Sequence, residues 1–172
     1  MIDLSKEKRA EYLQVTKRVD NIAQKAIEKT IYPLLNKLIR VTFDLVPAHA
    51  ADSPWLAKKL VEKGIIDPTT EQVLEILENE AETLDVNRAL GYVSSSSGGE
   101  LPAPVRVILK GISALVKKIG GAGWVEQLTY ENALEYAKKH DRELYAYLVK
   151  YPRVCKTVIE WLRKFLEKGA DA

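Results

Sequence analysis

The feature of this sequence that most limits the possible folds is the helical spacing of apolar residues in its last part. Apolar side chains recur there three or four positions apart, at Val154, Cys155, Val158, Ile159, Leu162, Phe165 and Leu166. This recurrence predicts an amphipathic helix that buries one stripe. Pro152 suits the first position of such a helix and Gly169 suits its end, so both ends are marked in the sequence.

Similar spacing runs through the first half of the chain. Residues 4–31 predict a long amphipathic helix, and Pro33 predicts a kink or a break before the pattern resumes over residues 34–46. A capping side chain stands directly before proline at Ser53 and again at Asp67, which predicts that helices begin there. The helix that opens at Asp67 is expected to bury an apolar face made of Val73, Leu74, Ile76, Leu77 and Leu84.

The second half follows a stretch rich in serine and glycine. Residues 94–100 predict a flexible linker. Residues 101–119 then carry another regular apolar stripe, and Thr129 is a suitable cap for one helix over residues 130–151. His140, which stands beside Asp141, is expected at the surface near a helix joint. Because no convincing alternation of apolar and polar residues occurs, the sequence predicts an all-α fold, a compact bundle of about six to eight helices.

The length of the chain fits one domain with a substantial core. With 172 residues, of which 47% are hydrophobic, the chain can bury about two-thirds of its unfolded surface. We therefore expect a single helical domain over residues 1–172. Its amino-terminal part covers residues 1–93, including an acidic insertion at 67–93, and its carboxyl-terminal part covers residues 101–172.

The charges are unevenly distributed along the chain. Residues 1–66 contain 12 basic and 8 acidic side chains, residues 67–100 contain 1 and 8, and residues 101–172 contain 13 and 8. Two basic arms thus flank an acidic segment. The favoured interpretation of its carboxylates is a solvated helix face, and the alternative is binding of a metal or a cationic partner.

Several classes of protein are excluded or disfavoured by what the sequence lacks. Cys155 is the only cysteine, so no disulfide framework is possible and a reducing, cytoplasmic location is expected. No uninterrupted apolar run is long enough for a membrane span, and the first residues do not resemble a signal peptide. With only two histidines and no phosphate-binding loop, we expect neither catalysis nor a cofactor.

Basic side chains on the predicted helices are the remaining candidates for a binding function. Two sets each share one face, Arg18, Lys25 and Lys29 in the first predicted helix and Arg106, Lys110 and Lys117 in residues 101–119; Arg153, Lys156, Arg163 and Lys164 are distributed around the last helix. Such stripes can follow a phosphate backbone without reading its sequence. Ordinary solvation is the alternative, since Glu160 stands at ion-pair spacing from Arg163 and Lys164.

Three stretches in a fixed order resemble one known family. The first holds Arg9-Ala10 and the run AQKAIEK at residues 23–29, and the second holds Leu101, Pro102, Pro104, Val105, Arg106 and Gly111. The third holds Tyr147-Leu148 and the run WLRKF at residues 161–165. Together they resemble the small all-helical subunit of the Cmr complex, the type III-B CRISPR effector that uses a guide RNA against target RNA. Residues 34–100 depart from the family because they are longer and sharply acidic.

The resemblance implies a non-catalytic subunit for antiviral defence. Such a subunit stacks with copies of itself along the effector, contacts other subunits of the ribonucleoprotein, and supports guide RNA and target RNA through basic side chains. Arg106, Arg163 and Lys164 match basic positions of the family, whereas Trp161 and Phe165 match core positions. The acidic segment is then expected to face away from RNA or to contact a basic neighbour.

Two other classes of function fit the same composition. A helical nucleoprotein, such as the coat subunit of an archaeal virus, would also be basic, all-α and polymeric. A regulator that binds proteins through the acidic helix would not bind nucleic acid. Polynucleotide binding and self-assembly distinguish the three.

Overall fold

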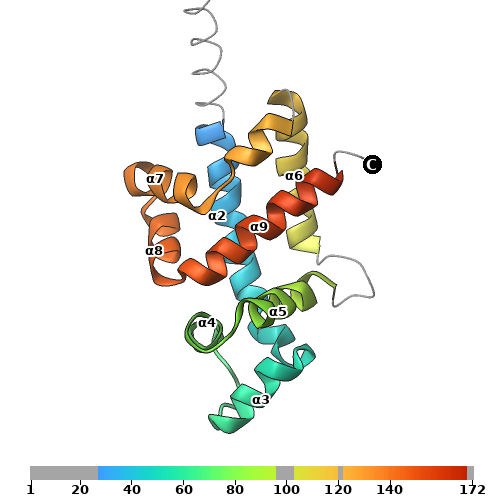
Figure 1. Cartoon of the computed structure of the whole chain (residues 1–172), viewed down its shortest axis with the longest axis vertical. Helices are drawn as coiled ribbons and strands as arrows, with labels where there is room; N and C mark the ends of the chain where they lie inside the picture. Colours follow the sequence, from blue (N-terminus) through green and yellow to red (C-terminus); the bar gives the residue numbers. More distant parts are fainter. Residues whose placement is uncertain (1–26, 96–102, 120–121, 170–172) are drawn as a thin grey trace, which may run out of the picture.

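The described secondary structure is helical throughout, which confirms the all-α prediction (Figure 1). This computed structural model describes residues 27–95, 103–119 and 122–169. The elements are η1 (Ile27–Ile31, a π-helix), α2 (Tyr32–Leu45), η2 (Pro47–Asp52, a 3-10 helix), α3 (Pro54–Glu62), α4 (Thr70–Asn79), α5 (Thr83–Ser95), α6 (Ala103–Ile119), η3 (Ala122–Gln127, a 3-10 helix), α7 (Tyr130–His140), α8 (Arg142–Lys150) and α9 (Pro152–Gly169). Among the described residues, no helix is both long and apolar enough to cross a bilayer.

Helix α2 lies in the middle of the described structure (Figure 1). It packs against α4 and α5, which precede the predicted linker, and against α6, which follows it. Its buried side chains recur at helical spacing and comprise Tyr32, Leu35, Leu38, Ile39, Thr42 and Phe43. This spacing places one continuous apolar face towards its neighbours, so α2 supplies apolar contacts to both halves of the chain.

Helix α9 crosses the bundle diagonally and begins at Pro152, as predicted (Figure 1). It contacts α4 and α5 as well as α6, α7 and α8. Six of its predicted stripe residues are buried, namely Val154, Cys155, Val158, Ile159, Leu162 and Leu166, and Phe165 is half-buried. Trp161 lies at the rim of the stripe with its ring centroid 6.4 Å from that of Phe165.

The acidic segment forms two helices, so the prediction of one helix from Asp67 is wrong. Helix α4 begins at Thr70 because Thr69 closes a capping box with Gln72. The Gln72 amide N–H donates to Thr69 Oγ1 (3.2 Å), and the Thr69 amide N–H donates to Gln72 Oε1 (2.9 Å). Leu84 follows the break that starts α5 and is 56% exposed, so it does not continue the buried face of α4.

The helix predicted over residues 130–151 is also divided into two, at Asp141. Thr129 caps α7 as predicted, since its Oγ1 accepts from the Asn132 amide N–H (3.1 Å). Asp141 leaves the helical conformation, and its Oδ1 accepts from the Leu144 amide N–H (3.1 Å) to cap α8. The helix joint expected near His140 is therefore confirmed, and His140 is exposed. The buried positions Ala137 and Leu144 are seven residues apart, a spacing that also fits one unbroken helix.

The predicted break near Pro33 corresponds to a change of helix type. The backbone changes from the π-helix η1 to the α-helix α2 between Ile31 and Tyr32, and Pro33 lies in the first turn of α2. A missing N–H costs little there. The helix predicted over residues 4–31 lies outside the described residues except for its last part, and so does most of the predicted linker.

Candidate nucleic-acid interface

Helix α6 carries two predicted cations on its exposed side. Its apolar stripe, which includes Leu109 and Ile112, is buried, whereas Lys110 and Lys117 are exposed. Within the described ranges, neither lysine has a carboxylate within ion-pair distance. Arg106 lies on the same face but is half-buried and makes an interaction of its own. The two lysines are therefore the more available charges on this helix.

Helix α9 carries four predicted cations, Arg153 at its start and three further along. Lys156 and Lys164 are exposed, and Arg163 is half-buried with its Nε enclosed and without a hydrogen-bond partner in the described part of the chain. Lys156 Nζ lies 5.0 Å from the ring centroid of Tyr130, which is a cation–π distance. No described ion pair involves these three side chains, so the pairing with Glu160 that the sequence spacing allows for Arg163 and Lys164 is not formed.

A hollow of about 110 Å³ lies between α9 and the start of α7. Its lining comprises Thr129, Tyr130, Glu131, Lys156, Ile159, Glu160 and Arg163. Tyr130 is held in place because its hydroxyl donates to the Leu148 carbonyl (2.7 Å), and burial is the main cause of its raised pKa. The volume is well below that of a typical small-molecule site, so the hollow suits a single small group rather than a cofactor.

Arg153, predicted to contact nucleic acid, instead joins the start of α9 to the end of α4. Its Nη1 donates to the Glu78 carbonyl (2.7 Å) and its Nη2 donates to the Ala81 carbonyl, which caps the end of α4. In return, the Glu78 carboxylate accepts from the amide N–H groups of Arg153 and Val154 (3.0 Å each) at the start of α9. We call these contacts the Glu78–Arg153 clamp. Because the guanidinium is engaged in this clamp, we remove Arg153 from the candidate interface.

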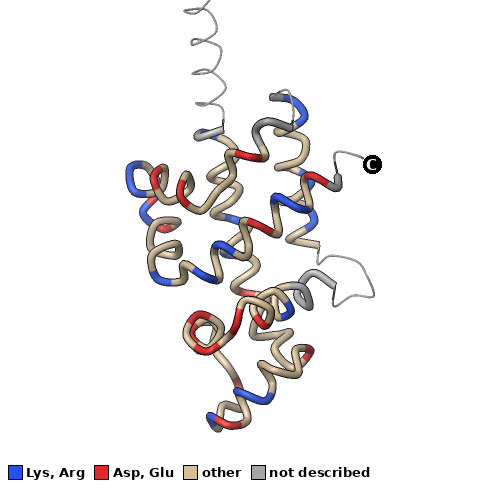
Figure 2. Tube along the Cα trace, viewed as in Figure 1, with Lys and Arg blue, Asp and Glu red and all other residues tan. Residues whose placement is uncertain are grey.

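The remaining predicted cations lie near the amino-terminal end of the chain. Lys29 is exposed in η1, whereas Arg18 and Lys25 lie outside the described residues. The structure places α6 and α9, the two helices that carry most of the described candidate cations, in contact with each other. Figure 2 shows Lys and Arg positions on both helices near the place where they cross, while acidic positions gather on α4 and the start of α5. We call Lys110, Lys117, Lys156, Arg163 and Lys164 the α6–α9 cation set.

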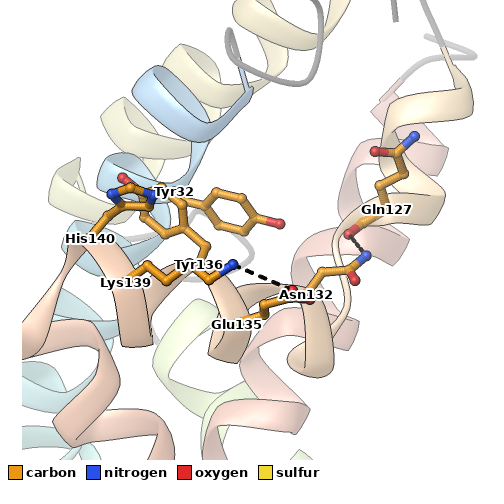
Figure 3. A pocket seen from close by; sticks show the side chains of 7 residues that line it. All are labelled: Tyr32, Gln127, Asn132, Glu135, Tyr136, Lys139 and His140. Carbon is orange, nitrogen blue, oxygen red and sulfur yellow. Dashed lines mark hydrogen bonds and ion pairs between the residues drawn. The ribbon is translucent and has the colours of Figure 1, made fainter. Parts of the chain in front are cut away.

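A second hollow, of about 330 Å³, lies beside α7 (Figure 3). Tyr32 stacks on Tyr136 with ring centroids 4.4 Å apart, and the His140 ring lies 5.2 Å from that of Tyr136. Across the hollow, the Asn132 side-chain amide donates to the Gln127 carbonyl (2.9 Å), and Lys139 Nζ lies 3.9 Å from Glu135 Oε1. The aromatic rings mainly join α2 to α7. In the described ranges, no cluster of three His, Cys, Asp or Glu side chains could hold a metal ion.

The single cysteine is enclosed in the core. Cys155 is fully buried in α9, and its Sγ lies 3.4 Å from the Tyr147 carbonyl, to which the thiol donates. Burial, with a smaller contribution from Glu78, raises the pKa of this thiol far above its usual value. The thiolate is the reactive form of cysteine, so Cys155 is a packing residue at neutral pH.

Two contacts made by α9 were not anticipated from the sequence. Tyr130 lies beneath Lys156, and Glu78 ends up at the start of α9. Both contacts join residues far apart in the chain, and no local pattern encodes them; the cap at Thr129 was the only signal close to the first. No protein-family model, curated protein or solved structure matches this chain.

Proposed function

We propose that this protein is a non-catalytic small subunit of an RNA-guided type III-B CRISPR interference complex. In this proposal it stacks with copies of itself and with other subunits, and it supports guide and target RNA through the α6–α9 cation set. The observation that carries the RNA contact is the presence of exposed lysines without described acidic partners on two helices that touch each other. The family assignment is supported by the ordered sequence motifs.

The chemistry of the cation set suits phosphate groups. Each lysine that neutralises a phosphate releases counterions from the polynucleotide, and this release favours binding at low salt. The helices that carry the lysines are fixed by buried residues, such as Leu109 in α6 and Leu162 in α9. Such contacts position a nucleic acid without reading its bases, which is what a subunit that serves many guide sequences requires.

The first test measures binding of the purified chain to single-stranded RNA, single-stranded DNA and duplex DNA by fluorescence anisotropy. We expect RNA to bind most tightly and its affinity to fall steeply as salt is added. Preference for duplex DNA together with self-assembly would favour the helical nucleoprotein instead. Absence of binding at low salt would contradict direct contact with RNA.

Paired charge reversals locate the RNA-binding face. Lys110→Glu with Lys117→Glu, and separately Lys156→Glu with Lys164→Glu, are expected to weaken RNA binding. The slope of log affinity against log salt should become shallower by about 0.7 for each phosphate that the variant no longer neutralises. Lys37→Glu with Lys58→Glu is the matched control, because these lysines are exposed on α2 and α3 and the charge change is equal. An equal weakening in the control would contradict the assignment to α6 and α9.

Co-expression tests the assembly itself. When the chain is produced together with the other subunits of a type III-B effector and a guide RNA, it is expected to elute with the ribonucleoprotein in size-exclusion chromatography. The doubly reversed variants should elute late, whereas the Lys37→Glu, Lys58→Glu control should remain in the complex.

A further inference from the structure

The end of α3 presents a large apolar side chain to solvent. Gly64 adopts a left-handed conformation (φ 71°), and the Ile65 and Gly64 amide N–H groups donate to the Leu60 (2.9 Å) and Val61 (3.0 Å) carbonyls. This pattern is a Schellman motif, which ends a helix. It turns Ile65 towards the core and leaves Ile66 92% exposed, with Val61 nearby at 78%. The exposure of Ile66 therefore follows from how α3 ends.

A hollow of about 380 Å³ lies beside this turn, between the end of α3 and one face of α4. It is lined by Lys63, Ile65, Gln72, Glu75, Ile76, Asn79 and Glu80. Ile65 and Ile76 give it apolar parts, and Lys63 Nζ bridges to Glu80 Oε2 at 2.9 Å. Ile66 directly follows Ile65, which lines the hollow. We call the hollow together with Ile66 the α3–α4 surface.

The charge around the α3–α4 surface is net negative. Residues 54–80, which include α3, the turn and α4, contain six acidic and three basic side chains. Glu71 and Glu75 are exposed on α4, and Figure 2 shows acidic positions gathered on this helix. Lys63 is tied to Glu80, and Lys150 is the basic group that approaches Glu71 and Glu75 from α8. The surface thus combines an exposed apolar side chain, a hollow and unbalanced carboxylates.

We propose that the α3–α4 surface is a docking site for a lysine- and arginine-rich amphipathic helix of a partner protein. Charge complementarity selects this occupant, because a basic helix can pair with the carboxylates of α4 while an apolar side chain contacts Ile66 and enters the hollow. A polynucleotide would be repelled by the same carboxylates. The site lies on helices other than α6 and α9, so it is separate from the proposed RNA contact.

The test uses the full chain and a synthetic helix of leucine and lysine, about 14 residues long, the length at which an isolated helix becomes stable. Two further peptides serve as probes of specificity: one has glutamate in place of lysine and the other has glycine in place of leucine. Binding is followed by the amide signals of the ¹⁵N-labelled chain in NMR spectra. We expect the leucine–lysine peptide to shift signals of residues 61–66 and 72–80 and the other two peptides to leave them unchanged.

Substitutions then separate this surface from the rest of the molecule. Ile66→Ser is expected to weaken peptide binding about tenfold, because serine cannot bury the same apolar area against the peptide, and Glu75→Lys is expected to weaken it further by charge repulsion. Val107→Ser is the matched control, since Val107 is likewise a largely exposed, branched apolar residue (69%), on α6. All three variants alter exposed side chains and are expected to fold.

The proposal is overturned by any of three results. The chain signals that the leucine–lysine peptide shifts could lie outside α3 and α4. The Ile66→Ser variant could bind this peptide as tightly as the parent chain, or the glutamate peptide could bind as tightly as the leucine–lysine peptide. Sedimentation supplies one more decisive outcome: if the parent chain dimerises and Ile66→Ser makes it monomeric, the occupant is a second copy and not a basic helix. RNA affinity should be unchanged in Ile66→Ser, so failure here leaves the RNA proposal intact.

Discussion

At the scale of single residues, two glycines differ in whether their backbone conformation tolerates a side chain. Gly111 lies inside α6, where an added Cβ would be 4.0 Å from Leu34 Cδ1, an ordinary contact. Gly64 has a positive φ (71°), and an added Cβ there would meet no atom within 4 Å. At Gly64, therefore, only the backbone conformation disfavours a residue with a side chain. Substituting the two glycines measures helix propensity at Gly111 and backbone strain at Gly64.

We predict that Gly111→Ala stabilises the chain by about 1 kcal/mol, because alanine favours the helix and restricts the unfolded chain. Gly64→Ala should destabilise it by about 1 kcal/mol, because an L-residue is strained in the left-handed region. Urea unfolding of both variants checks the pair. Equal signs for the two changes would contradict the conformations described.

The buried thiol gives a dependence of stability on pH. Burial raises the pKa of Cys155 above its usual value of 9.0 in the folded chain. The unfolded chain therefore loses this proton first as the pH rises, and the stability contributed by the protonated thiol is lost above pH 9.0. The expected loss is about 1.4 kcal/mol for each pH unit beyond that point.

Urea unfolding at about pH 8 and about pH 10 measures this loss. The Cys155→Ala variant is the control, because it retains every other alkaline titration of the protein. We expect the parent chain to lose more stability between the two pH values than the variant does. Parallel losses would show that the thiol does not titrate differently in the folded chain.

At the scale of elements, the Glu78–Arg153 clamp joins the end of α4 to the start of α9. Each partner caps the other's helix, since Glu78 accepts two N–H groups of α9 and Arg153 donates to two carbonyls at the end of α4. Helix ends leave such groups without partners inside the helix, and a carboxylate at a helix start also interacts favourably with its dipole.

Removing the carboxylate of Glu78 should therefore cost more than removing a solvated one. We predict that Glu78→Ala lowers the free energy of unfolding by about 2 kcal/mol. Glu75→Ala, one turn earlier and exposed, should change it by less than about 0.5 kcal/mol. Chemical denaturation compares the two variants. A similar effect of both substitutions would mean that the clamp adds nothing to stability.

The boundaries of the helices also show which structural features could be predicted from the sequence. The start of α9 at Pro152 and the cap at Thr129 were predicted, because each depends on residues next to one another in the chain. The joint expected near His140 is confirmed, but the span of one helix over residues 130–151 was wrong because the apolar spacing continues through the joint. A second contact at the joint, the Asn36 side-chain amide donating to Asp141 Oδ2 (3.0 Å), spans 105 positions of the chain.

The candidate interface was predictable to a similar extent. Helical spacing correctly placed Lys110 and Lys117 on the exposed side of α6. It could not show that Arg153 is engaged by α4, because rotation around one helix axis does not tell which neighbour packs there. The stripe predicted on α6 was therefore correct as an exposed face for its two lysines, and tertiary contacts decided which charges of α6 and α9 remain available.

At the scale of the whole molecule, helices from both sides of the predicted linker contact one another. Helix α2 packs against α6, and α5 packs against α9. Among the described residues, the buried side chains form one apolar cluster that includes Leu38, Leu77, Ile112 and Leu162. Neither half encloses these residues with its own helices alone.

We predict that a chain cut to residues 1–95 shows no cooperative thermal transition by circular dichroism, because the apolar faces of α2 and α5 lose their cover. A full chain carrying a protease site within residues 94–100 is the matched control. After cleavage, its two parts are expected to stay together and to melt cooperatively. A cooperative transition of residues 1–95 alone would contradict the single-domain prediction.

The position of α9 has a consequence for synthesis on the ribosome. Of the described elements, α9 is made last, yet it contacts helices from α4 to α8. Chains emerge from the ribosome amino-terminal end first, so the apolar faces of the earlier helices emerge before the helix that covers them. We therefore expect the nascent protein to be prone to aggregation during this interval. Synonymous codon changes that slow translation ahead of residue 152 should lower its yield without changing its final stability.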